Sequence, residues 1–306
     1  MNTNPRILIL GSSGQLGREL QRSFAGAGDV LACDRSAVDL ANPSQVRAAV
    51  RESNPDVILN AAAYTAVDRA ESEPDVAMAV NAKAPAALAE EALRLGALLV
   101  HYSTDYVFDG TKAGAWEESD GTNPLNVYGA TKLTGEQAIE SVGGSFLIFR
   151  TSWVYGPHGK NFLLTMLRLG RERDKLSIVA DQVGAPTTSI ELANATRAVV
   201  DTVVAGKCGS PETWAGVYHM TCGGATSWCG FAKAIFERSQ PLLDGRTPEV
   251  HPIPSSAYPT PARRPANSVL SNEKLAARFG IRLAPWDEAL ASVLRMLSGE
   301  TPKSRP

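Results

Sequence analysis

The chain begins by alternating short apolar runs with stretches whose apolar side chains recur at helical spacing. Residues 6–10 form a largely apolar run of strand length, and Leu16, Leu20 and Phe24 follow at four-residue intervals, which is typical of one face of a helix. A second short apolar run at 30–33 ends at Asp34. This order predicts a βαβ unit of about 30 residues, the length that a parallel crossover requires.

The same alternation continues along the chain. Further strands are predicted at 57–60, 98–102, 146–149, 176–179 and 217–220, and helices at 76–95, 127–139, 161–171, 190–204, 231–238, 272–279 and 286–297. A long irregular loop follows the strand at 98–102, and a proline-rich stretch covers 252–265. Regular alternation of strands and helices predicts an α/β fold with a right-handed, doubly wound parallel sheet and helices on both faces.

Composition narrows the classes of partner. The 306 residues carry 32 acidic and 30 basic side chains, so bulk nucleic acid and anionic membranes are not expected as partners. The four cysteines form no C-x-x-C pair, which favours reduced thiols. The N-terminus lacks an apolar signal segment, and the longest uncharged run, 213–232, contains four glycines. We therefore expect a soluble, cytoplasmic protein.

Three glycines, Gly11, Gly14 and Gly17, lie between the first predicted strand and the first predicted helix. Their G-x-x-G-x-x-G spacing differs from the more common G-x-G-x-x-G, but the physical purpose is the same. Missing Cβ atoms let the backbone turn tightly and approach a pyrophosphate at the start of the helix. The loop predicts binding of a dinucleotide.

The end of the second strand bears on the choice of dinucleotide. Asp34, seventeen residues after Gly17, is placed to accept hydrogen bonds from the adenosine ribose, which favours NADH. Arg35 beside it is suited instead to the 2′-phosphate of NADPH. The sequence leaves both cofactors open.

Tyr128 and Lys132 are four residues apart on a predicted helix, so they share one face. A phenol with its ordinary pKa near 10 is a poor acid–base catalyst at neutral pH, and a nearby ammonium lowers that pKa. Thr104 ends the strand before this helix, at the edge where open α/β sheets bind ligands. Its hydroxyl is suited to polarise a substrate carbonyl alongside the tyrosine.

These motifs resemble the extended short-chain dehydrogenases/reductases in order and spacing. The matching segments are the glycine loop at 11–17, Asn-Ala-Ala-Ala at 60–63, Ser-Thr at 103–104, and Tyr128-x-x-x-Lys132. Longer strings at 102–110, 124–136, 149–156, 181–187 and 258–271 are similar to one branch, the dTDP-4-dehydrorhamnose reductases. The resemblance runs from about residue 6 to residue 297.

The resemblance implies hydride transfer from NADPH or NADH to the C4 keto group of dTDP-4-dehydro-6-deoxy-L-mannose. Thr104, Tyr128 and Lys132 would be catalytic, with Tyr128 as the general acid. The cofactor would contact the following residues: Gly11, Gly14, Gln15, Leu16, Gly17, Asp34, Asp39, Leu40, Ala63, Tyr64, Thr65, Tyr128 and Lys132.

Other side chains are candidates for binding the dTDP-sugar substrate. Besides Thr104, these are Asp105, Trp153, whose ring suits the apolar side of a sugar, and Arg263 and Arg264, which suit a diphosphate. Members of this branch are described as Mg²⁺-dependent homodimers, and the matching metal ligands would be Glu19, Glu191 and Asp287 or Glu288.

The resemblance also implies two regions. We expect residues 1–155 to form a Rossmann-like NAD(P)-binding domain, to which segments at about 176–205 return. Residues 156–298 would mainly form a smaller α/β lobe for the substrate, and 299–306 a frayed tail. Two alternatives remain open: a related nucleotide-sugar epimerase or dehydratase, and a non-catalytic subunit that binds the nucleotide for regulation.

Overall fold

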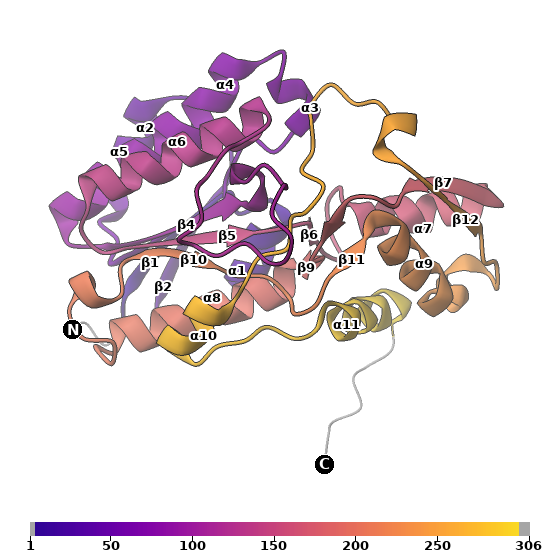
Figure 1. Cartoon of the computed structure of the whole chain (residues 1–306). Helices are drawn as coiled ribbons and strands as arrows, with labels where there is room; N and C mark the ends of the chain where they lie inside the picture. The colour runs from indigo at the N-terminus through magenta and orange to yellow at the C-terminus, as the bar shows by residue number, and fades with distance from the viewer. Residues whose placement is uncertain (1–3, 300–306) are drawn as a thin grey trace.

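A computed structural model describes residues 4–299 and contains a six-stranded parallel sheet with helices on both faces (Figure 1). From one edge to the other its strands are β10 (Gly216–His219), β5 (Phe146–Thr151), β4 (Leu98–Thr104), β3 (Val57–Asn60), β1 (Arg6–Leu10) and β2 (Asp29–Cys33). After β1 the chain first forms β2, which lies on one side of β1, and then β3, which lies on the other side. This reversal between β1 and β3 is the place where doubly wound sheets bind ligands.

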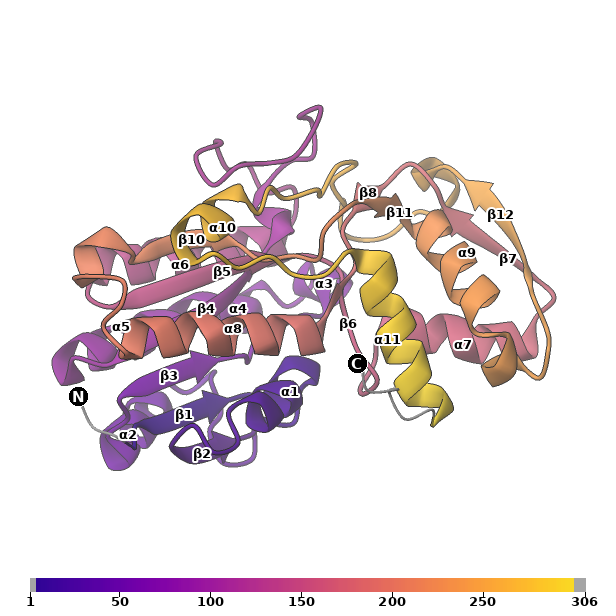
Figure 2. The same ribbon diagram turned by 90° about the horizontal axis from the view of Figure 1, so that it is seen from below.

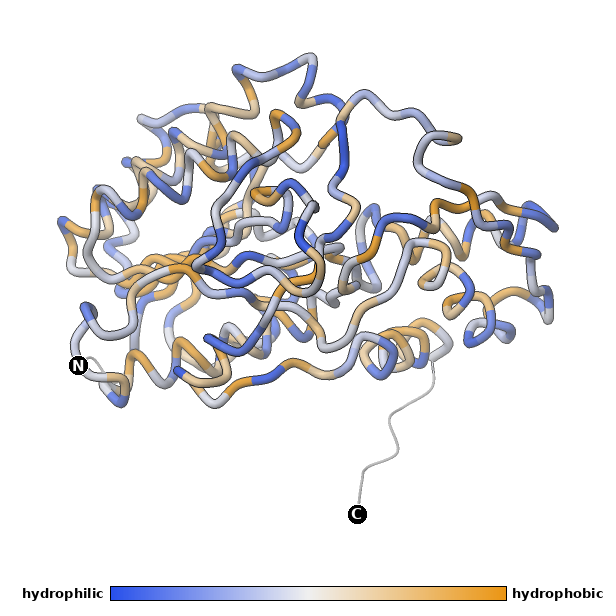
Figure 3. The backbone as a smooth tube through the Cα atoms, viewed as in Figure 1, coloured by the Kyte–Doolittle hydropathy of each residue, from blue (hydrophilic) through white to orange (hydrophobic). Residues whose placement is uncertain are grey.

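An apolar core lies on each face of the sheet, where the helices pack against the strands. On one face α1 (Gln15–Ser23), α8 (Ser189–Val204) and α10 (Glu273–Phe279) pack against the sheet, and α1 and α8 lie side by side (Figure 2). On the other face lie α2 (Pro43–Ser53), α5 (Ala84–Leu95) and α6 (Val127–Val142). The central strands are strongly hydrophobic along their length, as expected for a sheet buried on both sides (Figure 3).

A second lobe with its own core lies beyond the carboxyl ends of the strands. Its helices are α7 (Phe162–Glu172), α9 (Trp228–Arg238) and α11 (Trp286–Ser298), and β7 (Lys175–Val179) pairs with β12 (Glu249–Ile253). The remaining short elements are β6 (Val154–Tyr155), β8 (Val183–Gly184), β9 (Thr187–Thr188), β11 (Thr226–Ser227), α3 (Val67–Ala70), α4 (Pro74–Met78), η1 (Ala79–Lys83), η2 (Asp105–Val107), η3 (Pro211–Thr213), η4 (Gln240–Leu243) and η5 (Ser255–Ala257).

The predicted helix at 76–95 is continuous but irregular, because α4 and α5 are joined by a π-helical turn, η1. Asn81 lies in this turn, and its Oδ1 accepts a hydrogen bond from the Tyr64 backbone N–H (2.8 Å). Its Nδ2 donates to the Tyr64 carbonyl (3.1 Å) and to Thr131 Oγ1 (3.2 Å). The π turn thus ties the loop after β3 to α6, both of which border the ligand cleft described below.

The later part of the chain returns to the main sheet differently from the prediction. Helix α8 packs on the sheet as expected, and β10 joins it as an edge strand. The expectation that the strand at 176–179 also returns is wrong, because β7 pairs with β12 in the second lobe. Apolar runs of four or five residues do not reveal their pairing partner, which depends on contacts far along the chain.

Helix α2 is a second departure from the sequence analysis, which assigned no element there. It begins after Asn42, whose side-chain oxygen accepts from the backbone N–H groups of Ser44 (3.1 Å) and Gln45 (3.3 Å), and Pro43 occupies its first turn. Asparagine followed by proline is a recognisable helix-start signal.

Two further expectations concern the ends of the chain and its environment. The predicted frayed tail lies, except for its first residue, outside the described residues. Between residues 4 and 299, none of the helices combines the length and the apolar character needed to span a bilayer.

Candidate active site

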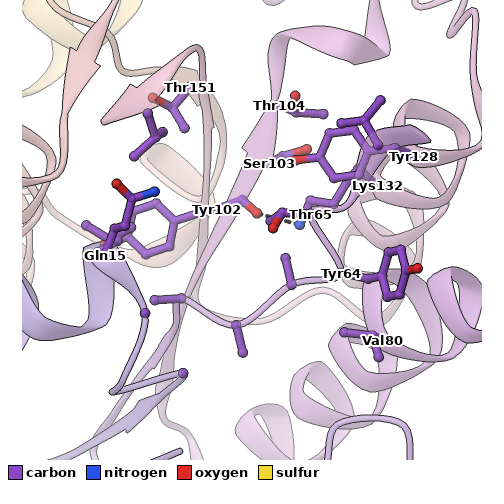
Figure 4. Close-up of a pocket in the computed structure, with 18 of the residues that line it drawn as sticks. Gln15, Tyr64, Thr65, Val80, Tyr102, Ser103, Thr104, Tyr128, Lys132 and Thr151 are labelled. Carbon is purple, nitrogen blue, oxygen red and sulfur yellow. Dashed lines mark hydrogen bonds between the residues drawn. The ribbon is translucent and has the colours of Figure 1, made fainter. Parts of the chain in front are cut away.

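A cleft of about 580 Å³ opens at the carboxyl ends of β1, β3 and β4 and is bordered by the second lobe. Most residues predicted to bind the cofactor or the substrate line it: Gly11, Gly14, Gln15, Leu16, Asp39, Leu40, Ala63, Tyr64, Thr65, Thr104, Asp105, Tyr128, Lys132 and Trp153. Figure 4 shows part of this lining, with Gln15 on one side and Tyr128 and Lys132 on the other. The residues that line the cleft extend from the glycine loop to α6.

The glycine loop is shaped by close backbone contacts. Gly11 has a φ of +80°, and a Cβ on Gly17 would lie 2.1 Å from the Gly11 carbonyl oxygen. Helix α1 begins directly after Gly14, and within residues 4–299 no side chain caps it. The uncapped N–H groups at the start of a helix attract an anion, which fits a dinucleotide pyrophosphate.

Asp34 and Arg35 follow β2, and the structure places these two candidates for binding the adenosine part of the cofactor differently. The Asp34 carboxylate accepts hydrogen bonds from Ser36 N (2.9 Å), Ser36 Oγ (2.6 Å) and Ala37 N (3.3 Å), and these bonds lower its pKa. Among the described residues, Asp34 is absent from the cleft lining, whereas Arg35 is part of it. Asp34 therefore stabilises a turn, and the cleft presents Arg35 here together with Asp39, whose Oδ1 lies 3.8 Å from Arg35 Nε.

Tyr128 reaches the cleft because α6 approaches the loop after β4 unusually closely. A Cβ on Gly129 would lie 2.2 Å from the Tyr106 carbonyl oxygen, so only glycine permits this packing. Asn126 caps the helix by accepting from Gly129 N (2.8 Å). The Tyr106 and Tyr128 rings meet edge to face, with centroids 5.9 Å apart. Gly129 was not among the predicted site residues, although it directly follows Tyr128 in the sequence.

Burial decides the protonation state of Tyr128. It raises the pKa of Tyr128 to about 12, and the Asp105 carboxylate acts in the same direction, while the Thr104 hydroxyl partly opposes them. The expectation that Lys132 lowers this pKa is not met in this structure. The Lys132 ammonium donates instead to the Tyr102 carbonyl (2.6 Å) and lies 3.0 Å from His101 Nε2. Tyr128 therefore remains a phenol, which is the form that donates a proton.

The floor of the cleft is polar and deeply buried. Thr104 Oγ1 donates to Asp105 Oδ1 (3.0 Å), and burial raises the pKa of Asp105 to about 7. Within residues 4–299, Asp105 Oδ2, Ser103 Oγ and Thr151 Oγ1 have no hydrogen-bond partner. Buried polar atoms left in this state are costly, so their grouping here fits a ligand rich in hydroxyl or carbonyl groups.

The second lobe contributes residues that the sequence analysis missed. The Trp153 ring stacks on Trp228 at a centroid distance of 3.5 Å, and both tryptophans line the cleft together with Lys160. Trp153 has a φ of +48°, which is rare for a bulky residue. Trp228 begins α9, 75 positions further along the chain, and the sequence contained no local signal for this pairing.

The two arginines predicted for the diphosphate are placed differently. Arg264 Nη1 and Nη2 donate to the two carboxylate oxygens of Asp68 at 3.0 and 2.9 Å, which ties the segment after η5 to α3. Arg263 is exposed, and its carbonyl accepts from Asn126 Nδ2 (2.7 Å). In the described part of the chain, neither arginine lines the cleft. Contact of either with a diphosphate stays a prediction.

The predicted metal ligands do not come together in this chain. Glu19 pairs with Arg22 (2.9 Å), Glu191 Oε2 accepts from Ala284 N (3.1 Å), and Asp287 pairs with Arg238 (3.2 Å). In residues 4–299, no three His, Cys, Asp or Glu side chains are close enough to share a metal ion. The trio is therefore not assembled within residues 4–299, and a metal held by these carboxylates at a contact between two chains stays a prediction.

A family model and curated relatives both match nearly the whole chain. The family model described as RmlD substrate binding domain matches residues 5–298. A dTDP-4-dehydrorhamnose reductase of Burkholderia thailandensis is 50% identical over 296 residues, covering 95% of this chain and 99% of that protein.

Two solved structures are similar over nearly their whole length. A Bacillus anthracis dTDP-4-dehydrorhamnose reductase in complex with NADP superposes with a TM-score of 0.86 at 35% identity, covering 96% of this chain and 99% of its own. An orthologue from Clostridium acetobutylicum gives 0.87 at 38% identity, with 95% and 99% covered.

Proposed function

This chain belongs to the RmlD substrate binding domain family of dTDP-4-dehydrorhamnose reductases, and from that membership we propose how its cleft works. The chain reduces the C4 keto group of dTDP-4-dehydro-6-deoxy-L-mannose to give dTDP-L-rhamnose. It is an NAD(P)H-dependent oxidoreductase, and the hydride comes from the nicotinamide of the cofactor. The single observation that carries the assignment of the reacting centre is Tyr128 beside Thr104 at the buried end of the cleft.

Tyr128 is the proton donor in this proposal. Hydride addition turns the C4 carbonyl oxygen into an alkoxide, which takes the phenolic proton. Thr104 polarises the same oxygen. Its hydroxyl proton, directed at Asp105 in the structure, turns toward the substrate because a hydroxyl rotates freely about its C–O bond. Ser103, whose hydroxyl has no partner among the described residues, supplies a further donor or acceptor at the cleft floor.

The other ligand contacts follow the lining. The glycine loop and the start of α1 bind the pyrophosphate, and Lys132 holds the nicotinamide ribose. The stacked Trp153 and Trp228 face the sugar, and Lys160 offers a cation to the phosphates. Cytoplasmic action fits the four cysteines, all of which are unpaired within the described residues. Mg²⁺ is not assigned a role, and a homodimer stays a prediction.

The reaction is tested by incubating the purified chain with dTDP-4-dehydro-6-deoxy-L-mannose and NADPH while following absorbance at 340 nm. We expect consumption of one NADPH for each sugar reduced, with dTDP-L-rhamnose identified by NMR. An epimerised or dehydrated sugar without net NADPH oxidation would overturn the proposal. A flat trace with bound nucleotide would favour a regulatory subunit instead.

The position of Arg35 in the cleft predicts whether the protein prefers NADPH or NADH. Because Arg35 lines the cleft while the Asp34 carboxylate is engaged in its turn, we expect NADPH to be preferred over NADH. Loss of a charge-assisted contact with the 2′-phosphate should raise the KM for NADPH about tenfold in Arg35→Ala.

The KM for NADH is the internal control, since NADH lacks the 2′-phosphate. It should change less than about twofold in the same variant. Equal increases for both cofactors would show that Arg35 contacts something other than the 2′-phosphate.

A further inference from the structure

Lys132 is connected to two buried polar side chains, His101 and Asn60, that have no role in the proposed mechanism, although Asn60 is the first residue of the motif at 60–63. His101 Nε2 lies 3.0 Å from Lys132 Nζ, and Asn60 lies 3.0 Å from the other ring nitrogen, His101 Nδ1. Asn60 and His101 are directly paired residues on β3 and β4, and all three side chains are only 1% exposed. The three groups form an unbroken line from the sheet to the cleft.

The proton on His101 can be placed by exclusion. Burial and the neighbouring Lys132 hold the pKa of His101 well below its usual value, so the imidazole is neutral and carries one N–H. A charged Lys132 has only hydrogens to offer, so Nε2 must accept and Nδ1 must carry the proton. Nδ1–H then needs an acceptor.

Asn60 supplies that acceptor when its amide is turned by 180° in the same space. The Oδ1 atom of Asn60 is buried and has no hydrogen-bond partner within residues 4–299, and the rotation brings it to Nδ1. The opposite arrangement, with Asn60 Nδ2 donating to Nδ1, would put the ring proton on Nε2, facing the ammonium hydrogens. Only the first arrangement gives both nitrogens of the His101 ring a suitable partner while Lys132 is charged.

The line is not a path for protons to solvent. It ends at an amide on a strand buried at every residue, and an amide oxygen does not pass a proton on. The charged group that acts on Lys132 is Glu136, one turn further along α6 and paired with Arg150 of β5 (2.7 Å). Tyr128 of α6 and Asp105 of η2 are the other titratable groups of the neighbouring cleft wall. Glu136 is engaged by Arg150, so the neutral imidazole is the side chain that directly accepts from the ammonium.

We propose that Asn60 and His101 are positioning residues for the reduction: Asn60 fixes His101 as the Nδ1–H tautomer, and His101 Nε2 accepts from Lys132, which keeps the ammonium charged and fixed at the wall of the cleft. This inference rests on the proposed function for its effect on catalysis, but the tautomer itself does not depend on any activity. Neutral imidazole suits this place because it accepts one hydrogen bond without adding a second charge beside the substrate.

The tautomer is measured in the full-length protein labelled with ¹⁵N-histidine, by long-range ¹H–¹⁵N correlation between pH 6 and 9. The signals of His101 are those lost in His101→Gln. We expect a protonated Nδ1 and an unprotonated Nε2 throughout this range. A ring protonated at Nε2, or at both nitrogens, would overturn the proposal whether or not the protein reduces the sugar.

The effect on catalysis is measured from the pH profile of kcat. Burial lowers the pKa of Lys132 to about 8, so activity that needs the ammonium should fall above that pH. His101→Leu removes the acceptor and should move this alkaline limb to lower pH by about one unit or more. His101→Gln restores an acceptor and should recover most of the shift, whereas Asn60→Leu should move the limb in the same direction as His101→Leu.

Matching profiles for the Leu and Gln variants would overturn the positioning role, since a merely structural residue would not distinguish them. If His101→Leu fails to fold, Asn60→Leu and the tautomer measurement still decide the question. Absence of turnover in the unmodified chain, with the Nδ1–H tautomer present, would count against the proposed function and leave the placement of Lys132 supported.

Discussion

Replacement of Tyr128 by phenylalanine is expected to reduce kcat by a factor of about 10² to 10⁴ while leaving the affinity for NADPH nearly unchanged. The substitution removes one hydroxyl and keeps the ring that meets Tyr106 edge to face. Because the pKa of Tyr128 is raised to about 12, the hydroxyl stays protonated at any working pH and is the nearest proton source proposed for the alkoxide. Single-turnover rates and NADPH titration by fluorescence measure the two quantities separately.

Tyr218→Phe is the matched control for this experiment. Tyr218 is also buried, its hydroxyl donates to the Trp214 carbonyl (2.7 Å), and neither residue is part of the cleft lining. We expect that variant to lose about 1 kcal/mol of stability and to keep its kcat. A Tyr128→Phe enzyme within threefold of the unmodified rate would contradict the assigned proton donor.

Replacement of Asp105 by asparagine is expected to stabilise the protein in a strongly pH-dependent way. Asp105 is 3% exposed, and burial raises its pKa from 3.8 to about 7. At roughly 1.4 kcal/mol for each pKa unit, the buried carboxylate costs about 4 kcal/mol once it is fully ionised. Asparagine has nearly the same shape and carries no charge.

The sign follows from proton binding. Because the pKa of Asp105 is higher in the folded than in the unfolded chain, the folded state binds more protons between pH 4 and 7. The contribution of Asp105 to stability is therefore least unfavourable below pH 4, declines as the pH rises to about 7, and stays constant above. The gain from Asp105→Asn should be near zero at pH 4 and approach about 4 kcal/mol at pH 8.

Urea unfolding of both proteins at pH 5, 6, 7 and 8 measures this difference. Asp109→Asn provides a control of opposite sign, because hydrogen bonds from Thr111 and Asn123 lower the pKa of Asp109. Its stability relative to the unmodified chain should be lower by the same amount at all four pH values, because the lowered pKa confines the titration of Asp109 to below pH 5. A pH-independent gain for Asp105→Asn would show that Asp105 is neutral or paired over the whole range.

The position of Asp105 gives a reason why the protein carries a residue that lowers its stability. Its Oδ2 has no partner within residues 4–299, and it lies on the cleft floor beside Thr104. Binding sites commonly retain polar groups that destabilise the protein alone and are satisfied by the ligand. We therefore expect Asp105→Asn to gain stability and to lose affinity for the sugar.

Much of the fold and part of the site follow from local signals in the sequence. The main strands and helices were predicted because a buried parallel strand needs a continuous apolar run and a helix needs apolar side chains at its own period. The glycine loop, Thr104, Tyr128 and Lys132 were identified from short motifs, and the structure places them in one cleft. Each of these signals lies within a few residues of chain.

Other features depend on residues that meet only in the folded chain. The orientation of Asp34 toward Ser36, the pairing of Arg264 with Asp68, and the assignment of β7 to the second lobe required the tertiary structure. The pKa of Tyr128 also went against expectation, because burial outweighs a cation that is directed elsewhere. Burial and orientation are sums over contacts from several elements, and no local pattern records them.

By itself, the sequence determined the family and the α/β fold and predicted the groups proposed to react, because these reside in motifs of two to fourteen residues. The tertiary structure alone decided how those groups are supported. Asn60, His101 and Lys132 are 41 and 31 positions apart, and they meet because neighbouring strands pair in register and α6 packs over them. The reason is geometric: a motif specifies a side chain, whereas its charge and direction are set by whatever the fold packs against it.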